Sequence, residues 1–208
     1  MSFHKISRLI AGALCVAAPL LFAGDAKFSE RGKLVFSDDF SGSAMAPGWN
    51  GKPGKWEMVD GAVKVSQVKE DNHAAVRRHA LPPYHDAIFE FSFEFDGATA
   101  IGLSLNNKGG HVCRLMISPK GMTLQVDAPN ATSELKAVRL ATSTTPVESG
   151  KWHKVVVEVH GPTMIAQLDE GPAISGENAR VDVDKTDVGI PVGGVSAKVK
   201  GLKVYSLQ

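Results

Sequence analysis

The chain has 208 residues, of which 43% are hydrophobic, which suits one domain of ordinary size with a substantial core. Its 23 basic and 22 acidic residues leave a formal net charge of +1. This balance argues against a nucleic-acid-binding protein, which carries a marked basic excess. It is compatible with a neutral partner such as a sugar.

The start of the chain predicts a secretory signal peptide. A basic stretch ending at Arg8 precedes an uncharged apolar run over residues 9–23, and small residues follow up to Ala26. The run is shorter than the roughly 20 apolar residues that a membrane span needs. We therefore expect residues 1–26 to be removed. Residues 27–208 would then form one mature domain, secreted or periplasmic in a bacterial envelope, without a membrane partner.

Removal of the leader would take Cys15 with it and leave Cys113 as the remaining cysteine. A lone cysteine cannot form an internal disulfide, so the stability of the domain must come from burial. Cys113 lies in an alternating apolar segment, and we expect it to be a small buried residue.

Beyond residue 34 the apolar residues recur with a period of two. The clearest case is the segment 87–97, AIFEFSFEFDG, in which four phenylalanines alternate with polar residues. Such alternation predicts a strand with one buried face and one solvated face. Similar segments cover 100–106, 111–118 and 122–127, with turn residues such as Asp60-Gly61 and Ser118–Gly121 between strands. The fold class is therefore all-β, a sandwich or a barrel.

Three further segments carry specific expectations. The apolar parity changes across Lys200-Gly201, which predicts a β-bulge at this glycine. The polar stretch 136–150 is interpreted as a surface connection with a short strand at 138–141. The basic segment 71–86, DNHAAVRRHALPPYHD, is interpreted as loop-like, with surface histidines.

Several sequence blocks resemble a known family, the concanavalin A-like proteins described as 3-keto-disaccharide hydrolases or family 16 glycoside hydrolases. The blocks are VFSDDFSG at 35–42, GKWEMVDG at 54–61, GKWHKVVVEV at 150–159, AQLD at 166–169, VGI at 188–190 and the last strand at 195–205. The resemblance implies a jelly-roll sandwich of two antiparallel sheets. Two departures argue against hydrolase activity: Ala98–Gly102 replaces an Asn-Ser-Gly stretch, and Gly110–Leu115 replaces a Glu-x-Gln strand.

Glu90 and Glu94 are the candidate catalytic residues, because family 16 glucanases place two glutamates on one strand face around an Asp. Here Ser92 stands between them. In a regular strand their Cα atoms lie about 13 Å apart, whereas a retaining pair needs carboxyl groups roughly 5–5.5 Å apart. The alternative is an ordinary solvent-facing strand.

The polar sides of four successive strands predict a carbohydrate-binding face. If the segments from 87 to 127 pair in sequence order, their polar residues share one side of one sheet. The candidate binding residues are Glu94, Ser104, Asn106, Arg114 and Gln125. The alternative is a solvated face with cross-strand charge pairs such as Glu94 with Arg114.

No cofactor is required by the sequence, although Asp38, Asp39 and Asp184 could supply oxygen ligands to a structural Ca²⁺ between the terminal strands. Nucleophile-elbow, phosphate-loop, dinucleotide and zinc-protease motifs are missing. Three hypotheses follow. The first is a secreted, non-catalytic protein that interacts with a carbohydrate or polysaccharide. The second is a glycoside-cleaving enzyme of the 3-keto-disaccharide hydrolase type, and the third is a structural or adhesive envelope protein.

Overall fold

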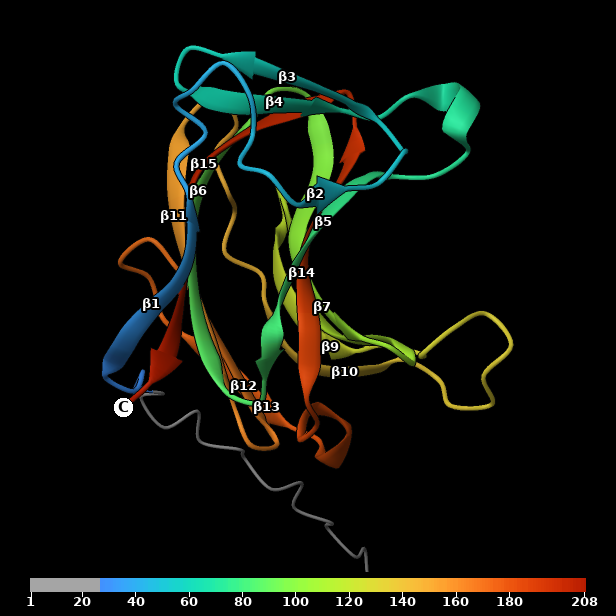
Figure 1. The fold of residues 1–208 in the computed structure, drawn as a ribbon, viewed down its shortest axis with the longest axis vertical. Helices are drawn as coiled ribbons and strands as arrows, with labels where there is room; N and C mark the ends of the chain where they lie inside the picture. Colours follow the sequence, from blue (N-terminus) through green and yellow to red (C-terminus); the bar gives the residue numbers. More distant parts are fainter. Residues whose placement is uncertain (1–26) are drawn as a thin grey trace, which may run out of the picture.

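The computed structural model describes residues 27–208, so the expected signal peptide at 1–26 lies outside the described residues. The described part is an all-β sandwich in which every strand pair is antiparallel. Figure 1 shows its two layers side by side. No helix among these residues is long and apolar enough to cross a bilayer.

One layer is an eight-stranded sheet. Its spatial order is β13 (Ile174–Glu177), β12 (Thr163–Leu168), β11 (Trp152–His160), β6 (Ala87–Phe95), β15 (Ser196–Leu207), β4 (Ala62–Ser66) and β3 (Lys55–Val59), and β1 (Arg31–Asp38) pairs with β15.

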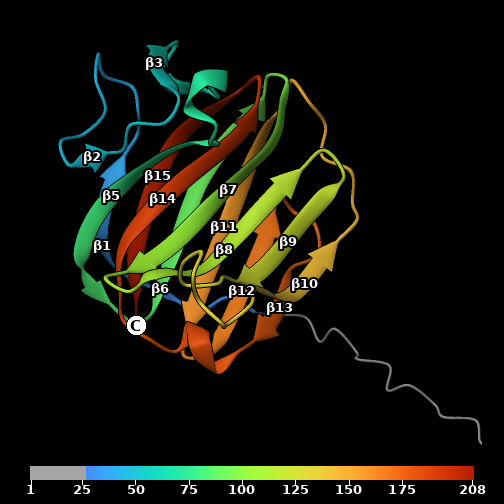
Figure 2. The ribbon, with the colours of Figure 1, turned by 90° about the vertical axis from the view of Figure 1, so that its right-hand side faces the viewer.

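The other layer is a seven-stranded sheet, seen face-on in Figure 2. Its order is β10 (Val138–Ser143), β9 (Gly121–Val126), β8 (Gly110–Ser118), β7 (Ala98–Asn107), β14 (Lys185–Gly194), β5 (Ala75–Tyr84) and β2 (Trp49–Asn50). Two 3₁₀ turns, η1 (Lys69–Asp71) and η2 (Ala179–Val181), complete the described elements.

The core lies between the sheets and follows the alternation that the sequence predicts. Phe89, Phe91, Phe93 and Phe95 are all buried, each with at most 1% of its surface exposed. Cys113 is fully buried among the same apolar residues, and burial raises the pKa of its thiol to about 12. The expected role of Cys113 as a small buried residue is confirmed.

Local turn chemistry is also confirmed at two positions. Asp60 and Gly61 have φ angles of 50° and 72°, the left-handed pair that a two-residue hairpin needs to join β3 to β4. Gly201 has a φ of 66° and lies at the register shift between Lys200 and Lys203 in the pairing of β15 with β6. This bulge keeps both halves of β15 facing the core.

The interpretation of segment 71–86 as a loop is wrong, because β5 occupies most of it. Two inward side chains between Ala75 and Leu81 on β5 are polar, Arg77 and His79, so the segment shows no apolar alternation. The guanidinium of Arg77 lies 5.4 Å from the ring centroid of Trp56, and His79 stacks on Phe36 at 3.9 Å. Pro82 and Pro83 fall at the irregularity in the pairing of β5 with β14. Proline has no N–H to donate, but at this irregularity no regular hydrogen bond between the two strands is lost.

The assumption that strands pair in sequence order is wrong at one step. β6 pairs with β11 and β15 in the eight-stranded sheet, whereas β7 pairs with β8 and β14 in the seven-stranded sheet. The chain crosses between the layers at Asp96-Gly97, where Gly97 has a φ of 81°. The polar residues of β6 and β7 therefore lie on opposite outer faces of the sandwich.

Candidate functional site

A row of residues in register crosses the outer face of the seven-stranded sheet. Each member lies beside the next on a neighbouring strand, and we call this set the transverse row. Its members, in spatial order, are Arg78, Gly189, Ser104, Arg114, Gln125 and Arg139. The chain neighbours of the four central members are core residues, for example Leu103 and Leu105 on either side of Ser104. The row therefore points away from the core.

The middle of the transverse row has no room for a side chain at Gly189. A Cβ atom there would lie 2.6 Å from Oγ of Ser104 and 3.2 Å from Cγ of Arg78. A side chain cannot be added without displacing one of these neighbours. The side chains of Arg78 and Ser104 thus pack against Gly189, which is buried between them.

Asp127 anchors the central arginine of the row. Its carboxylate is only 3% exposed, and it accepts hydrogen bonds from Nε of Arg114 and Nε2 of Gln125, both at 2.6 Å. Charge-assisted hydrogen bonds of this kind restrict the side chains that make them. Within residues 27–208, the terminal guanidinium nitrogens of Arg114 make no hydrogen bond, so they remain available to a ligand.

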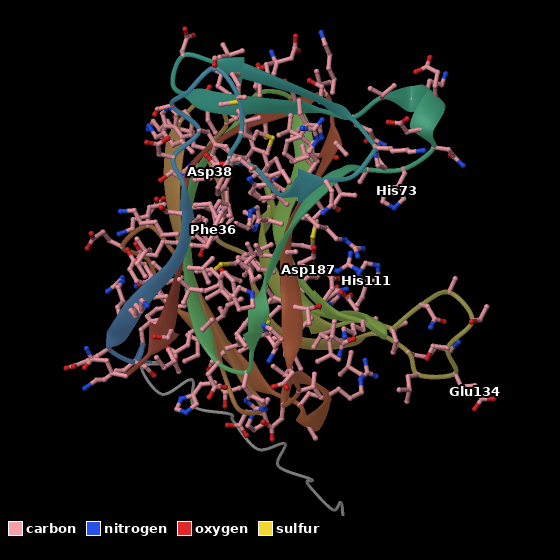
Figure 3. All side chains as sticks on the ribbon, viewed as in Figure 1. Phe36, Asp38, His73, His111, Glu134 and Asp187 are labelled. Carbon is pink, nitrogen blue, oxygen red and sulfur yellow. The ribbon has the colours of Figure 1, made fainter. Side chains whose placement is uncertain are left out.

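A second polar network lies beside the transverse row, on the same strands β7, β8 and β14. The Asn106 amide is fully buried and donates from Nδ2 to Oδ1 of Asp187 at 2.6 Å. Its Oδ1 lies 2.6 Å from Nδ1 of His111. Because Oδ1 is an acceptor, this contact assigns the imidazole proton to Nδ1 and leaves Nε2 as an acceptor. Figure 3 shows Asp187 and His111 on the right of the sandwich, between His73 above and Glu134 below.

The environment favours the neutral form of His111. Burial lowers its pKa from the ordinary value of 6.5, and the nearby charges of Arg114 and Arg78 act in the same direction. The carboxylates of Asp127 and Asp187 oppose this shift without reversing it. His111 is therefore a hydrogen-bonding group rather than a cation at neutral pH.

Two hollows flank the turn between β7 and β8. The larger, of about 420 Å³, is lined by residues that include Arg78, Lys108 and Asp187. The smaller, of about 250 Å³, is lined by residues that include His111, Asp127, Leu135 and Arg180. The polar networks described above thus face open space on both sides of this turn.

The loop between β9 and β10 projects from the same face, as Figure 1 shows. Arg180 holds its base by donating to the carbonyl oxygens of Lys136 at 2.9 Å and Asp127 at 2.5 Å. The backbone N–H of His111 donates to the carbonyl of Pro129 at 3.0 Å. These contacts make the loop a fixed wall of the smaller hollow.

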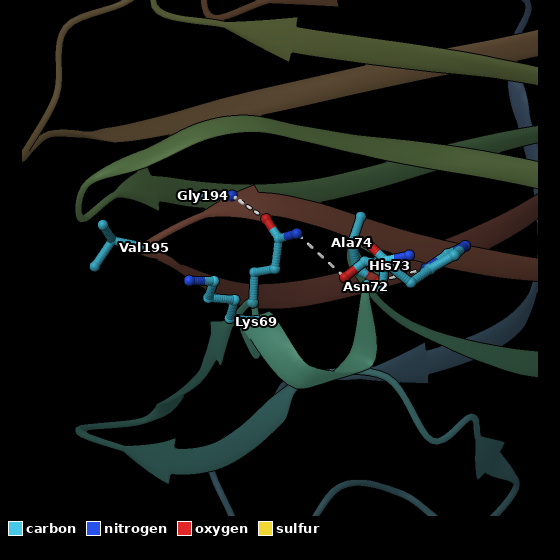
Figure 4. Close-up of a pocket in the computed structure, with 7 residues that line it drawn as sticks. Lys69, Asn72, His73, Ala74, Gly194 and Val195 are labelled. Atoms are coloured by element: carbon cyan, nitrogen blue, oxygen red, sulfur yellow. Dashed lines mark hydrogen bonds between the residues drawn. The ribbon is translucent and has the colours of Figure 1, made fainter.

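A third hollow, of about 660 Å³, lies at the far end of β14 beside η1. Gln67 spans it, accepting from the N–H of Gly194 at 2.7 Å and donating to the carbonyl of His73 at 3.2 Å. Figure 4 shows Gly194 and His73 on either side of this hollow. Both ends of the Gln67 amide are engaged in this structure. We interpret Gln67 as a structural residue that holds the segment after η1 next to the end of β14.

Four of the five predicted carbohydrate-binding residues come together on the seven-stranded face. Ser104, Arg114 and Gln125 belong to the transverse row, and Asn106 lies in the adjacent network. Glu94 does not join them, because β6 belongs to the other sheet. Its partner is Lys198, with Nζ 3.0 Å from Oε1, and the suggested pair with Arg114 does not form.

The candidate catalytic glutamates lie on the outer face of the eight-stranded sheet. Glu90 pairs with Arg31 from β1, and Glu94 with Lys198 from β15. Each carboxylate is therefore held by a basic side chain of an adjoining strand, and the chain places both away from the hollows of the other sheet.

The three aspartates suggested for calcium do not form a cluster. Asp38 accepts from the N–H groups of Phe40 and Ala46 at 3.0 and 2.7 Å, and from Nε1 of Trp49 at 2.9 Å. Asp39 instead accepts from the N–H and hydroxyl of Ser41. In the described residues, no three His, Cys, Asp or Glu side chains are arranged to hold a metal.

Sequence reasoning missed several residues of this face. Arg78 was missed because β5 lacks apolar alternation. Arg139 was placed in the short strand expected at 138–141, which the structure confirms as part of β10, but was not assigned to this face. His111 and Asp187 belong to strands that meet Asn106 only through pairing between β7, β8 and β14. The signal that could have revealed Asp187 is the alternation of Val188, Ile190 and Val192, which places it on the solvent side of a strand.

Together, the two antiparallel sheets and their polar outer face define a concanavalin A-type jelly roll, a fold used by carbohydrate-binding modules and glycoside hydrolases. A family model for the laminin G domain matches residues 93–206, which is more than half of the chain. The chain therefore belongs to the laminin G domain family. No curated protein sequence matches it.

Solved structures share the fold at low sequence identity. Carbohydrate-binding module CBM66 from Bacillus subtilis has a TM-score of 0.61 and 15% identity, covering 76% of this chain and 96% of the module. SCLam, a non-specific endo-β-1,3(4)-glucanase from family GH16, has a TM-score of 0.61 and 12% identity, covering 88% and 97% of the two chains. LamA from Z. galactanivorans, in complex with laminaritriose and laminaritetraose, has a TM-score of 0.59 and 14% identity, with coverage of 85% and 100%.

Proposed function

We propose that this protein binds a carbohydrate along the outer face of the seven-stranded sheet and does not cleave it. The observation that carries the proposal is the transverse row, in which donors and acceptors from five strands point to the same side of the sheet. Sugars present alternating hydroxyl donors and acceptors, which match amide, hydroxyl and guanidinium groups.

Hydrogen bonds within the protein orient the polar groups of this face. Asp127 holds Arg114 and Gln125, and Asp187 and His111 hold the amide of Asn106. Less side-chain entropy is lost on binding when the groups that contact the ligand are fixed beforehand. The arrangement therefore supports a binding role.

The positions of the carboxylates support a non-catalytic role. A retaining glycosidase needs two carboxyl groups roughly 5–5.5 Å apart on either side of the scissile bond. Glu90 and Glu94 are held in ion pairs on the other sheet. On the proposed binding face, Asp127 and Asp187 each accept hydrogen bonds from neighbouring side chains.

Glycoside cleavage of the 3-keto-disaccharide hydrolase type is the second candidate function. The observation in its favour is His111, whose lowered pKa and outward-facing hollow suit a general base. This candidate predicts that bound oligosaccharide is converted to shorter products, and that His111→Gln abolishes conversion while binding persists. Unchanged oligosaccharide after prolonged incubation excludes it.

We also propose that residues 1–26 direct the protein to the periplasm or the cell exterior, where polysaccharides are accessible. Fractionation of cells that express the whole chain tests this, with N-terminal sequencing of the product. An uncleaved protein in the cytoplasm contradicts it.

The test of carbohydrate binding is a glycan array with the purified protein and two matched variants. Gln125→Leu removes a donor from the transverse row, and Gln167→Leu removes one from the opposite sheet. Each glutamine donates one hydrogen bond, to Asp127 at 2.6 Å and to the carbonyl of Gly171 at 2.8 Å. We expect Gln125→Leu to lose the array signal and Gln167→Leu to retain it. Absence of any glycan signal for the unmodified protein overturns the proposal and favours a structural or adhesive role.

A further inference from the structure

The transverse row contains three arginines at fixed intervals. Arg78 is three strand positions from Arg114, and Arg139 is two positions from Arg114 on the other side. With about 4.8 Å between neighbouring strands, these steps correspond to about 14 and 10 Å. Each interval is longer than one monosaccharide, so a single ligand that meets all three arginines is an oligosaccharide running across the strands.

Both outer faces of the sandwich carry basic side chains, and on the seven-stranded face they include the three arginines of the transverse row. On the eight-stranded face, Lys198 pairs with Glu94, Arg31 with Glu90 and Lys64 with Asp96, while Lys154 and Lys203 make no ion pair within residues 27–208. On the seven-stranded face, Arg78 and Arg139 make no ion pair with any residue between 27 and 208. Both guanidinium groups can therefore pair with an acidic group of a ligand.

Arg114, the third arginine of the row, is engaged only in part. Its Nε donates to Asp127, while its terminal nitrogens make no hydrogen bond or ion pair with the part of the chain that the structure describes. A guanidinium held at Nε presents its remaining N–H groups as a paired donor that matches the two oxygens of a carboxylate or sulfate. Lys108 and Arg180 line the hollows on either side and extend the basic surface.

We propose that the ligand of this face is an anionic glycan, with one acidic group held by each of Arg78, Arg114 and Arg139. This inference rests on the proposed carbohydrate-binding function and names the class of sugar. Gly189 and Ser104 lie between Arg78 and Arg114 without a long side chain. Both residues are buried, so the sugar backbone passes above them while its acidic groups reach the arginines.

The experiment is a calorimetric titration of the whole protein with oligogalacturonate and with the same oligomer fully methyl-esterified. The ester keeps the chain and the hydroxyl groups but removes the charge. We expect the acid to bind at least about tenfold more tightly than the ester, and its affinity to fall when NaCl rises from about 50 to about 500 mM. A sulfated galactan and neutral laminarin are titrated in parallel, to separate sulfate from carboxylate and both from neutral chains.

Three variants that each lose one positive charge show which face of the sandwich binds the acidic oligosaccharide. We expect Arg78→Gln and Arg139→Gln each to weaken binding of an acidic oligosaccharide by about tenfold. Lys154→Gln, which removes an exposed cation from β11 on the opposite face, should leave affinity unchanged. Arg139 is exposed, so its replacement does not depend on repacking, and thermal unfolding verifies that each variant is folded.

The outcomes separate this inference from the proposed function. Equal affinity for the acid and its ester, or equal weakening by Lys154→Gln and Arg78→Gln, overturns the anionic ligand. If laminarin binds and Gln125→Leu removes that binding while acidic oligomers do not bind, the inference fails and the proposed function stands. If none of the four glycans binds and the glycan array is also silent, both fail.

Discussion

Nε of Arg114 donates to Oδ2 of Asp127 at 2.6 Å, and this hydrogen bond connects a solvent-exposed side chain of the seven-stranded sheet to a buried carboxylate. Asp127 follows β9 immediately and is 3% exposed, whereas the Arg114 side chain on β8 keeps 27% of its surface exposed. The buried carboxylate therefore determines where the exposed guanidinium points. The site depends on a side chain that a ligand would hardly reach.

Replacement of Asp127 should test this dependence. Asp127→Ala leaves Arg114 and Gln125 without their shared acceptor, and we expect a loss of about 1–3 kcal/mol in the free energy of unfolding. Urea denaturation measures the loss, with Asp184→Ala as a control at an exposed carboxylate. An equal effect of the two substitutions would contradict the assigned role of Asp127.

The alternation along β6 predicts a sharp contrast between adjacent residues. Phe93 is fully buried between the sheets, so Phe93→Ala should cost about 3–5 kcal/mol in unfolding free energy. Ser92 is on the opposite side of the same strand, and Ser92→Ala should stay within about 0.5 kcal/mol of the unmodified protein. Chemical denaturation of both variants checks the pair, and similar losses would argue against a strand at this position.

Two glycines should respond to alanine for different reasons. A Cβ atom at Gly102 would lie 2.3 Å from the carbonyl oxygen of Leu115 and 2.6 Å from Sδ of Met116, so backbone atoms must move. A Cβ atom at Gly201 would meet nothing within 4 Å, and the cost there is the left-handed φ of 66°. We expect Gly201→Ala to cost about 1 kcal/mol and Gly102→Ala about 3 kcal/mol. Melting temperatures in the reverse order would rule out these two causes.

The stability of the fold should depend on pH through His153. Burial alone would lower its pKa, but the hydrogen bonds to the Asp169 carboxylate at 2.7 Å and the Glu148 carbonyl at 2.8 Å outweigh burial and raise it. Both partners are acceptors, so both ring nitrogens donate and the imidazolium form is favoured.

A raised pKa means that the folded state holds this proton more tightly than the unfolded chain. The stabilisation is complete below the ordinary value of 6.5 and is lost as the pH rises through the raised pKa of the folded state. We therefore expect the difference in unfolding free energy between the unmodified protein and His153→Gln to be larger at about pH 5.5 than at about pH 9. Because other titrating groups cancel in this difference, a flat or inverted profile would exclude the mechanism.

How far the sequence predicts the site can be seen from β6 and β7. Alternation correctly assigned the buried phenylalanines on β6 and the outward Ser104 and Asn106 on β7. It could not show that these consecutive strands pair in different sheets, so Glu94 was placed with the wrong neighbours. Arg78 was missed for the opposite reason, because the inward residues on either side of it in β5, Arg77 and His79, are polar.

The sequence by itself determined the all-β class, the buried face of most strands, the hairpin at Asp60-Gly61 and the bulge at Gly201. These features depend on contacts within a strand or a turn, where side-chain alternation and φ preference act locally. Only the tertiary structure decided which outer face each polar residue joins. That choice depends on hydrogen bonds between distant segments, above all the insertion of β14 between β5 and β7, which brings Asp187 to Asn106 and Arg78 into line with Arg114.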